Sequence, residues 1–476
     1  MSTILSTLET AWLIFLVVMF FNVMIFVHEL GHFLAGKWRG AYIDRFQIWF
    51  GKPVWQKKIG GVQWGIGWIP AGGFVSLPQL ADMQGIEGEA DIPKDLKPLK
   101  PLDKVIIAAA GPLASLALAY FFAILVFFVG KPVAELPTTT IGYVPENSPA
   151  AQAGLQPGDI IRAVDGQEVH KWAGNMEGVR ELVAMSEHEK ITFTIERPQA
   201  DGSTQQLTIE SGYKLPETKW WQRTAMRQVG IMPAAPAIIG NIIPGSPAQQ
   251  AGLVTGQRIV KLNGAAVYSP VAILEAAEKG AVELTLQNPD GSEMTTTLTP
   301  ALPGNWQGLE GARPIMGFLW GGLDTKPETE YPGVQEQINQ SFRWMGETLA
   351  KVAAPGSSVG MEHLSGPVGI GSYLYQMLST TDGWKLIFWF AVVLNVNLAV
   401  LNILPLPIVD GGHVVLGTLE IIFRRPVGGK LLEWIQTGFI FLLLTFFIFV
   451  TFKDVGDLVG GDEEAAAKLP APVFSK

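Results

Sequence analysis

The sequence predicts a polytopic α-helical membrane protein with four transmembrane helices, a membrane-associated β-region and two repeated β-rich domains of the α+β type. Hydrophobic residues make up 48% of the 476 residues and charged residues only 16%, which is low for a soluble enzyme. Four apolar stretches are long enough to cross a bilayer, which takes about 20 residues per helix. A duplicated segment of domain size separates the second stretch from the third.

Composition restricts the class of protein further. The net charge of −9 gives no basic footprint for a nucleic acid. The chain has no cysteine, so disulfides are excluded and any metal ion must be held by His, Asp or Glu. The first ten residues contain no Lys or Arg. A cleaved signal peptide needs a positive start, so we expect the first apolar run to be retained as a membrane helix.

In chain order, the patterns predict the following segments: a first transmembrane helix at 1–36, a membrane-associated β-region with a cytoplasmic loop at 37–103, a second helix at 104–130, repeated domains at 138–222 and 226–305, an amphipathic juxtamembrane segment at 328–382, a third helix at 384–413, a fourth at 431–453 and a disordered tail at 454–476.

Basic residues predict the orientation. Ten Lys and Arg residues lie between positions 37 and 104, where the second helix begins, and Arg424, Arg425 and Lys430 lie between the last two helices. The positive-inside rule makes both links cytoplasmic. Both termini and the long segment with the repeats are then expected on the outer side of the membrane.

The link after the first helix has the pattern of strands. Between residues 41 and 77, large apolar residues alternate and glycines punctuate the run, which favours hairpins. Trp49, Trp55, Trp64 and Trp68 are typical of a membrane interface. We expect β-structure dipping into the membrane, where it could guide an extended peptide by strand addition. A plain cytoplasmic hairpin is the alternative.

The outer segment contains an internal repeat. Residues 148–155, Ser-Pro-Ala-Ala-Gln-Ala-Gly-Leu, recur as Ser-Pro-Ala-Gln-Gln-Ala-Gly-Leu at 246–253, an offset of 98 residues. This pattern, followed by Gly and then Asp/Asn-Gly, resembles the PDZ domain of bacterial proteases. The resemblance implies domains that bind extended peptide ends, or bulky shields if that groove is lost. The second copy departs at Gln257 and Arg258, where the first has Asp159 and Ile160.

The chemistry is concentrated in the pentapeptide His28-Glu29-Leu30-Gly31-His32 at the end of the first apolar run. Histidines four apart share one face of a helix and can bind one metal ion. In such sites the glutamate takes a proton from water. Two core histidines beside a chance glutamate would be the alternative, but ionisable residues in a membrane helix are functional candidates.

Two histidines leave a catalytic zinc site one ligand short. Metzincins need Gly and His where this chain has Ala35 and Trp38, and thermolysin-like enzymes need a glutamate roughly twenty residues downstream on a second helix. Glu87 is the first glutamate after Glu29, so neither soluble pattern fits. The ligand must come from elsewhere in the chain.

Residues 402–413, Asn-Ile-Leu-Pro-Leu-Pro-Ile-Val-Asp-Gly-Gly-His, interrupt the third apolar run. Pro405 and Pro407 break the helix, and broken backbone at membrane depth must be buried or line a cavity. Asp410 is the preferred third ligand, because two histidines and a carboxylate are a known zinc set, and His413 is its competitor. Asn402, with the two prolines, is expected to contact an unwound substrate, or to serve as a partner in the helix kink.

These paired motifs and the tandem repeats resemble the site-2 protease family over nearly the whole chain. The resemblance implies an intramembrane endopeptidase with one zinc ion on His28, His32 and Asp410, activated through Glu29. It also implies single-span membrane proteins of the anti-sigma-factor type as substrates, trimmed outside beforehand, and remnant signal peptides. We expect a monomer in a stress response, with the repeats acting as a size filter and the active site near the cytoplasmic face. The resemblance also implies the bacterial inner membrane, with both termini and the repeats on its periplasmic side.

Two other classes of protein remain open from the sequence. A membrane scaffold would use the repeats to recruit partners and would carry a decayed metal site. A metal transporter would leave the repeats and Glu29 without a role. Zinc content distinguishes a scaffold from an enzyme, because only the enzyme needs one ion per chain.

Overall fold

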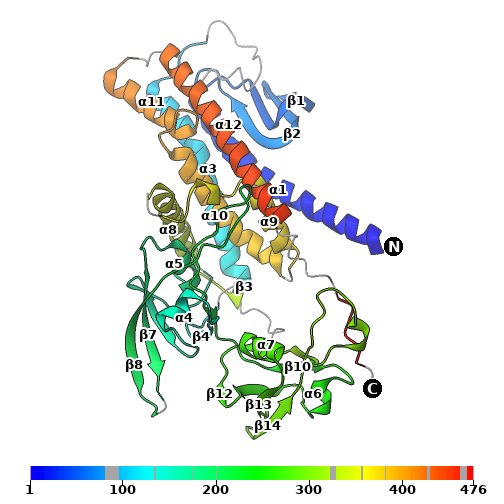
Figure 1. Ribbon diagram of the computed structural model, residues 1–476. Coiled ribbons are helices and arrows are strands. Elements are labelled where there is room, and N and C mark those ends of the chain that lie inside the picture. The colour runs from blue at the N-terminus through cyan, green and yellow to red at the C-terminus, as the bar shows by residue number, and fades with distance from the viewer. Residues whose placement is uncertain are drawn as a thin grey trace. The chain divides into compact units, whose positions relative to one another are not determined.

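Figure 1 shows the computed structural model of the chain. It describes residues 2–80, 96–132, 136–174, 176–199, 201–321, 329–354, 357–380, 382–425, 429–460 and 469–474. Parts of the expected cytoplasmic loops and of the tail therefore lie outside the described residues. The chain forms two compact units. The membrane unit comprises Met1–Pro132, Thr329–Leu349 and Ser365–Asp454, and the repeat unit comprises Val133–Glu328, Ala350–Leu364 and Val455–Lys476.

The membrane unit is mainly helical. Its elements are α1 (Ser2–Arg39), β1 (Arg45–Ile59), β2 (Val62–Ser76), α3 (Pro101–Val129), β3 (Lys131–Pro132), β16 (Thr329–Glu330), most of α8 (Val334–Ala353), α9 (Pro367–Leu378), α10 (Gly383–Ile403), α11 (Asp410–Phe423) and most of α12 (Gly429–Gly460).

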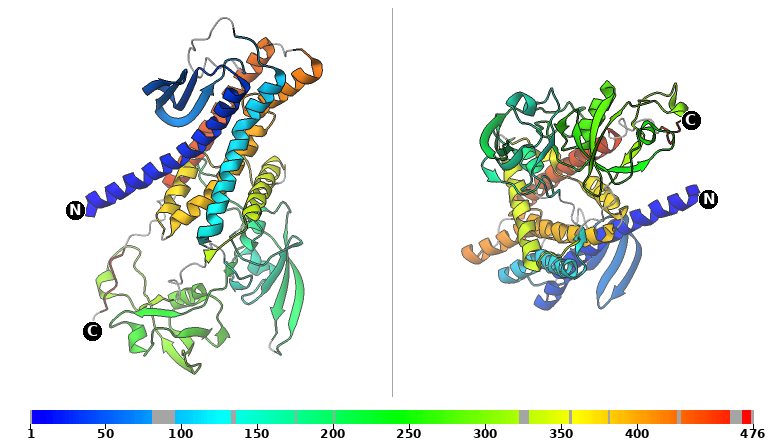
Figure 2. Two further views of the ribbon diagram at one scale, coloured as in Figure 1. Left: turned by 180° about the vertical axis from the view of Figure 1, so that it is seen from behind. Right: turned by 90° about the horizontal axis from the view of Figure 1, so that it is seen from below.

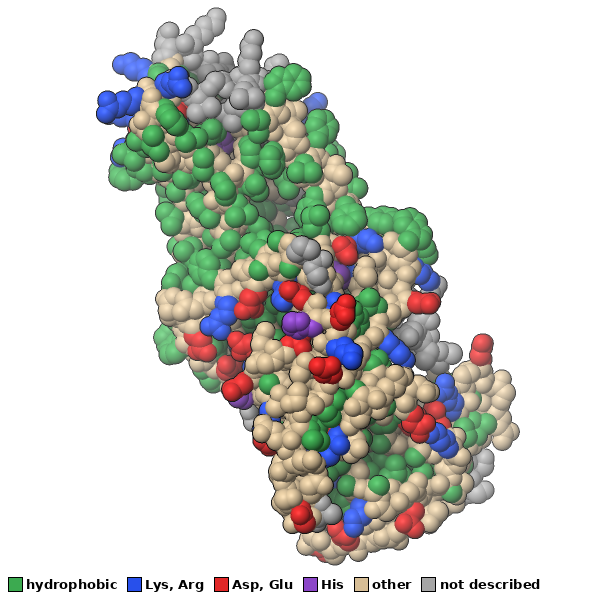
Figure 3. Space-filling view, turned by 60° about the vertical axis from the view of Figure 1, so that its left-hand side comes forward, with side chains coloured by type: hydrophobic (Ala, Val, Ile, Leu, Met, Phe, Trp, Pro, Cys, Tyr) green, Lys and Arg blue, Asp and Glu red, His purple; other side chains and the backbone are tan. Residues whose placement is uncertain are grey.

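Four helices in the described part of the chain are long and apolar enough to cross a membrane. These spans are Thr10–Arg39, Pro101–Val129, Gly383–Ile403 and Trp434–Gly460. Large hydrophobic side chains such as Phe15, Phe128 and Phe441 are exposed on them, and Figure 3 shows hydrophobic side chains covering the visible face of this unit. A surface of this kind is stable in lipid, so this unit is a membrane domain.

Helix α3 is the centre of the membrane unit. It contacts α1, α10 and α11, which are far apart in the sequence (Figures 1 and 2). Its residues Ile107, Ala108, Ala119 and Ala123 are fully buried. Small side chains at these crossings let the helix axes approach closely, which is how helices associate in lipid.

Strands β1 and β2 form a bent sheet beside α1. Phe46 of β1 pairs both with Trp64 and with Val75, because β2 folds back across β1. The Phe46 ring stacks on Trp64 with 4.5 Å between centroids and also meets Phe33 of α1. Trp64 is therefore half-buried in an aromatic cluster, whereas Trp68 is 62% exposed, and a position of these residues at the membrane interface stays a prediction.

The third apolar run is broken where the prolines predicted. Helix α10 ends at Ile403 and α11 begins at Asp410. Two glycines allow the tight connection: a β-carbon on Gly411 would stand 2.2 Å from the Leu404 carbonyl oxygen, and one on Gly412 would stand 2.2 Å from that of Leu406. The new helix continues to Phe423, beyond the expected boundary at 413.

The expected amphipathic segment is helix α8. Its buried face includes Gln337 and Ile338, and Ile338 packs in a cluster with Ala119 and Ala123 of α3. The Gln337 side chain donates a 3.1 Å hydrogen bond to the Ala123 carbonyl. The first half of α8 is thus part of the helical bundle, because its apolar side chains pack against α3.

The repeat unit contains two similar folds. Its elements are β4 (Ile141–Tyr143), α4 (Pro149–Ala153), β5 (Ile160–Val164), β6 (Gln167–Glu168), α5 (Val179–Met185), β7 (Ile191–Pro198), β8 (Thr204–Ser211), β9 (Met232–Pro233), β10 (Ile239–Ile242), α6 (Pro247–Gln250), β11 (Arg258–Leu262), β12 (Ala265–Ala266), α7 (Pro270–Lys279), β13 (Val282–Gln287), β14 (Glu293–Leu298), the 3-10 turns η1 (Gly304–Trp306) and η2 (Met361–His363), and β15 (Phe318–Trp320).

The two sheets have the same strand order, β6-β5-β7-β8 in the first repeat and β12-β11-β13-β14 in the second. Each repeat has its own hydrophobic core. Pairing of β4 with β9, and of β10 with β15, extends the repeats beyond the expected ends at 222 and 305. The predicted ends were wrong because β9 and β15, which complete the two repeats, lie after the duplicated sequence pattern in the chain.

Asp159 of the first repeat and Gln257 of the second occupy equivalent positions, and each has hydrogen-bond partners suited to its own side chain. Asp159 is buried and pairs with the Arg197 guanidinium at 2.7 Å, while its other oxygen accepts from the Gln156 N–H at 2.8 Å. Gln257 accepts in the same way from the Val254 N–H and donates to Asn288, both at 2.8 Å. An amide pair replaces the ion pair, so both sites remain satisfied.

The C-terminal part of the chain differs from the expected disordered tail. Helix α12 continues to Gly460, and residues 469–474 form hydrogen bonds with the turn at 304–306. The boundary at 453 was wrong because Asp457 pairs with Arg223, which keeps the last turns of the helix ordered. Residues 461–468 lie outside the described part.

Candidate metal centre

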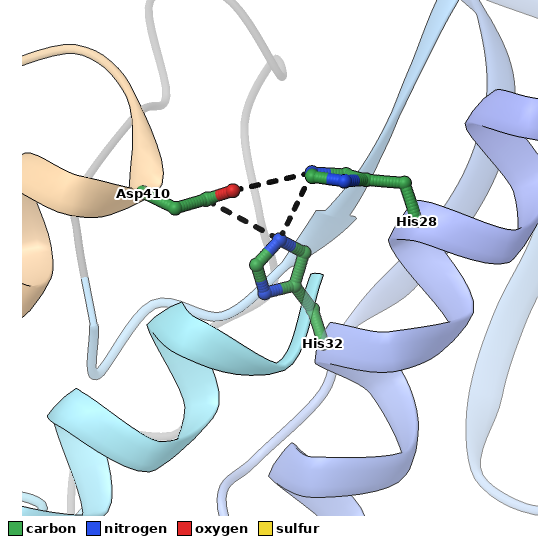
Figure 4. A group of neighbouring side chains, drawn as sticks. All are labelled: His28, His32 and Asp410. Atoms are coloured by element: carbon green, nitrogen blue, oxygen red, sulfur yellow. Dashed lines mark hydrogen bonds and ion pairs between the residues drawn. The ribbon is translucent and has the colours of Figure 1, made fainter. Parts of the chain in front are cut away.

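Three side chains meet inside the membrane unit (Figure 4). His28 and His32 lie one turn apart on α1, and Asp410 is the first residue of α11. Nε2 of His28 is 3.2 Å from one Asp410 oxygen, Nε2 of His32 is 3.3 Å from the other, and the two Nε2 atoms are 3.4 Å apart. Both imidazoles are buried.

This spacing fits a zinc ion. Zinc binds histidine nitrogen and carboxylate oxygen at about 2.0–2.2 Å, which corresponds to about 3.3–3.6 Å between ligand atoms in a tetrahedron. The three separations are 3.2, 3.3 and 3.4 Å, so two of them lie within this range and one lies just below it. The Asp410 oxygen that lies 3.2 Å from Nε2 of His28 is buried and makes no well-aligned hydrogen bond among the described residues. A bound cation would compensate the burial of this carboxylate, and His, His and Asp are a zinc donor set.

The second nitrogen of each histidine is held by helix α3. Nδ1 of His32 donates to the Ile107 carbonyl at 2.8 Å, so Nε2 of that ring carries the free electron pair. Nδ1 of His28 is 3.0 Å from the Ser115 hydroxyl. Such bonds to the outer nitrogen fix the orientation of metal-binding imidazoles and raise their basicity.

Glycines bring α1 and α3 together at the site. A β-carbon on Gly31 would stand 2.4 Å from the Ala110 carbonyl oxygen, and one on Gly111 would stand 2.1 Å from Nε2 of His32. A side chain at Gly31 would force the helices apart, and one at Gly111 would displace the His32 ring or separate the helices. The close crossing therefore places the backbone of α3 within reach of both imidazoles.

Helix α11 is also positioned by α3. A β-carbon on Gly417 would stand 2.8 Å from a methyl group of Val105, so the two helices are in close contact. One turn further, Lys104 and Glu420 form a half-buried ion pair at 2.9 Å. These contacts fix the start of α11, and with it the carboxylate of Asp410, opposite the histidines.

Glu29 lies beside the donor group rather than in it. It follows His28 on α1 and faces β2, where a β-carbon on Gly73 would stand 3.7 Å from its Cγ. The Val75 backbone is also a neighbour of its carboxyl group. A carboxylate next to a metal site but outside the ligand set can accept and return a proton.

The remaining predicted residues lie around the connection between α10 and α11. Asn402 is half-buried near the end of α10, and Pro405 and Pro407 lie in the non-helical segment that leads to Asp410. Gln436 of α12 donates to the Pro407 carbonyl at 3.2 Å. His413 lies outside the group formed by His28, His32 and Asp410.

Sequence reasoning did not find Ser115, the Ile107 carbonyl or Gly111. The run Ala108-Ala109-Ala110-Gly111-Pro112 in an apolar span was the available signal, because small residues mark close helix crossings. No local sequence pattern predicts which helix crosses α3 at these residues.

Comparison with known proteins identifies the family. Residues 15–446 match the family model described as Peptidase family M50. The chain belongs to this peptidase family. It is therefore a membrane-embedded zinc metalloprotease of the site-2 type, and the resemblance seen in the sequence is confirmed.

Individual relatives align with this chain over nearly their whole length. A Neisseria meningitidis protein, provisionally named a zinc metalloprotease, is 29% identical over 92% of this chain and 97% of its own. The Regulator of sigma-E protease RseP of Escherichia coli is 29% identical over 89% of this chain and 94% of its own. A Haemophilus influenzae protein named Regulator of sigma E protease is 27% identical over 91% and 96%.

Proposed function

We propose that this protease cleaves single-span membrane proteins within the bilayer, with one zinc ion held by His28, His32 and Asp410. The observation that carries the proposal is the spacing of the three donor atoms, 3.2–3.4 Å, in a buried site between apolar helices. Two of these residues come from the first span and one from the break after the third.

Different residues of the chain have separate roles in the proposed hydrolysis. Bound zinc would supply a Lewis acid that activates water and polarises the scissile carbonyl. Glu29 is placed to take the proton from the attacking water and to return it to the leaving amine. Ser115 and the Ile107 carbonyl hold the imidazoles in orientation.

Substrate access uses the irregular backbone. A transmembrane helix hides its amides in hydrogen bonds, so the segment to be cut must unwind. The non-helical residues 404–409 and the bent strand β2 both lie next to a member of the site. We assign Asn402, Pro405 and Pro407 to binding the unwound segment.

The cellular role follows from the charge pattern and the relatives. The positive-inside rule places both termini and the repeats in the periplasm and the site near the cytoplasmic face of the bacterial inner membrane. Two of the relatives carry the name Regulator of sigma E protease. We therefore assign this chain to regulated intramembrane proteolysis of anti-sigma-factor-type substrates in a stress response, with PDZ-like repeats as a size filter.

Replacing Glu29 tests the assignment. Glu29→Gln should retain about one zinc per chain by elemental analysis but should not cleave a fluorescent single-span peptide. The unmodified enzyme should lose cleavage in a zinc chelator and regain it when zinc is added. Cleavage by Glu29→Gln would refute the role of this residue, and zinc well below one per chain would indicate a scaffold instead.

A further inference from the structure

The last described residues, 469–474, lie against the second repeat and are called the tail peptide (Figure 1). The Trp306 indole N–H donates to the Pro470 carbonyl at 2.7 Å. Asn305 donates to the Ala471 carbonyl and accepts from the Val473 N–H, both at 2.8 Å. The Gly304 N–H donates to the Val473 carbonyl at 2.8 Å.

All four bonds use the backbone of the tail peptide, so the turn at 304–306 recognises an extended chain rather than particular side chains. Prolines suit this mode of binding. Pro470 and Pro472 have no N–H group to leave unpaired, and their fixed φ angles reduce the conformational entropy lost on binding. The contact differs from strand addition, because its partners belong to a turn and not to the edge of a sheet.

An aromatic side chain ends the contact. A β-carbon on Gly245 would stand 3.4 Å from Cβ of Phe474, and one on Gly317 would stand 3.4 Å from its ring. These glycines have φ angles of +74° and +88°, a region that side chains disfavour. Two turns whose φ angles favour glycine therefore leave room for the half-buried Phe474 ring.

We propose that the 304–306 turn, Gly245 and Gly317 form a peptide-binding site and that the tail peptide is its tethered ligand. Eight residues, 461–468, connect this peptide to the end of α12. A short tether of this kind gives an effective concentration of about a millimolar. The tail therefore excludes other peptides of the same chemistry, extended and proline-containing with an aromatic end, unless they bind far more tightly.

The same end of the chain is attached to the repeat unit at a second place. Asp457, in the last turns of α12, accepts from the Arg223 backbone N–H at 3.0 Å and pairs with its guanidinium. Arg223 also donates to the Glu362 carbonyl at 2.7 Å and lies in the segment between the two repeats. The last turns of α12 and the tail peptide are thus each attached to the repeat unit, the former at the inter-repeat segment and the latter at the second repeat.

A disulfide in the full chain tests the contact directly. The natural protein has no cysteine, so Gly245→Cys with Phe474→Cys introduces the only two thiols. A Cβ–Cβ distance of 3.4 Å is close to the roughly 3.5–4.5 Å of disulfides. Mild oxidation should give an intramolecular disulfide by mass spectrometry. The control pair Gly291→Cys with Phe474→Cys uses a glycine of the second repeat with a similar φ angle, +86°, where a β-carbon would have nothing within 4 Å, so this pair should remain reduced.

Peptide binding tests the site. A chain ending at Lys468 should bind a fluorescent peptide of residues 469–476 by anisotropy, and the full chain should bind it at least tenfold more weakly. Asn305→Ala should weaken binding to the shortened chain at least tenfold, whereas Glu310→Ala should not change it. Equal binding to the shortened and full chains, no binding to either, or equal disulfide yields from the two cysteine pairs would overturn the proposal. Neither readout requires protease activity.

Discussion

Gly111 of α3 faces Nε2 of His32 so closely that a β-carbon at that position would stand 2.1 Å from the nitrogen. The same nitrogen is 3.3 Å from Asp410 and 3.4 Å from Nε2 of His28. The backbone of α3 therefore forms one wall of the metal centre. Because a side chain would occupy the position of the imidazole, only glycine fits.

Gly111→Ala should abolish function by displacing His32. The added methyl group must push the imidazole away from Asp410 or separate α1 from α3, so we expect zinc affinity and peptide cleavage to fall by more than the roughly 10–100-fold that loss of a contact supporting a metal ligand costs. The matched control is Gly438→Ala in α12, where a β-carbon would have nothing within 4 Å. Normal zinc content and cleavage in Gly111→Ala would show that the helices do not cross so closely.

Ser115→Ala should weaken zinc binding without removing a ligand. The hydroxyl is 3.0 Å from Nδ1 of His28 and sets the orientation of the ring. Loss of such a contact typically costs about 10–100-fold in metal affinity, which can be measured by competition with a calibrated chelator. Thr445→Ala is the control, because its hydroxyl bonds only to the Phe441 carbonyl of its own helix in the described contacts. Equal affinities in the two variants would contradict a role for Ser115.

Local periodicity explains what the sequence predicted about this centre. The histidines were predicted because a spacing of four places two side chains on one helix face. Asp410 was predicted because prolines and glycines beside a lone acid are unusual in an apolar run. Ser115 and Gly111 could not be found in this way. Their importance depends on the register in which α3 crosses α1, and that register is set by close packing at Gly31 rather than by a repeating pattern.

The same limit applies outside the centre. Trp64 has the composition signal of an interface residue, yet it stacks on Phe46 because β2 folds back on β1. The acidic and Ala/Pro-rich end of the chain predicts disorder, yet residues 469–474 bind the turn at 304–306. In both cases the local composition does not predict the contact between distant segments.

Asp410→Ala and His413→Ala should differ sharply, although both residues lie on α11. Loss of Asp410 removes a carboxylate 3.2 Å from His28 and 3.3 Å from His32, so we expect no bound zinc and no cleavage. His413 lies outside that group, so His413→Ala should keep about one zinc per chain. Elemental analysis of both purified variants decides the third ligand, and the reverse result would assign it to His413.

Asp159→Asn should destabilise the first repeat. The buried carboxylate pairs with Arg197 at 2.7 Å, and bonds to charged groups contribute roughly 1.5–3 kcal/mol each. Hydrogen exchange in β5 and β7 should accelerate accordingly. The control, Arg162→Gln, breaks a half-exposed ion pair with Glu196 on the same sheet and should cost less than about 1 kcal/mol. Similar effects of the two changes would mean that burial of Asp159 adds nothing.

Removing both repeats should relax the selection of substrates. Each repeat has a packed core, in which residues such as Phe193 and Leu284 are fully buried, so the pair forms rigid obstacles rather than flexible chain. A chain lacking residues 136–321 should cleave substrates that still carry their outer domain, as well as trimmed ones, in a gel-based assay. The same deletion combined with Glu29→Gln must cleave neither, which excludes a contaminating protease. If the shortened enzyme cuts trimmed substrates but leaves untrimmed ones intact, the selection must lie in the membrane unit and the size-filter assignment fails.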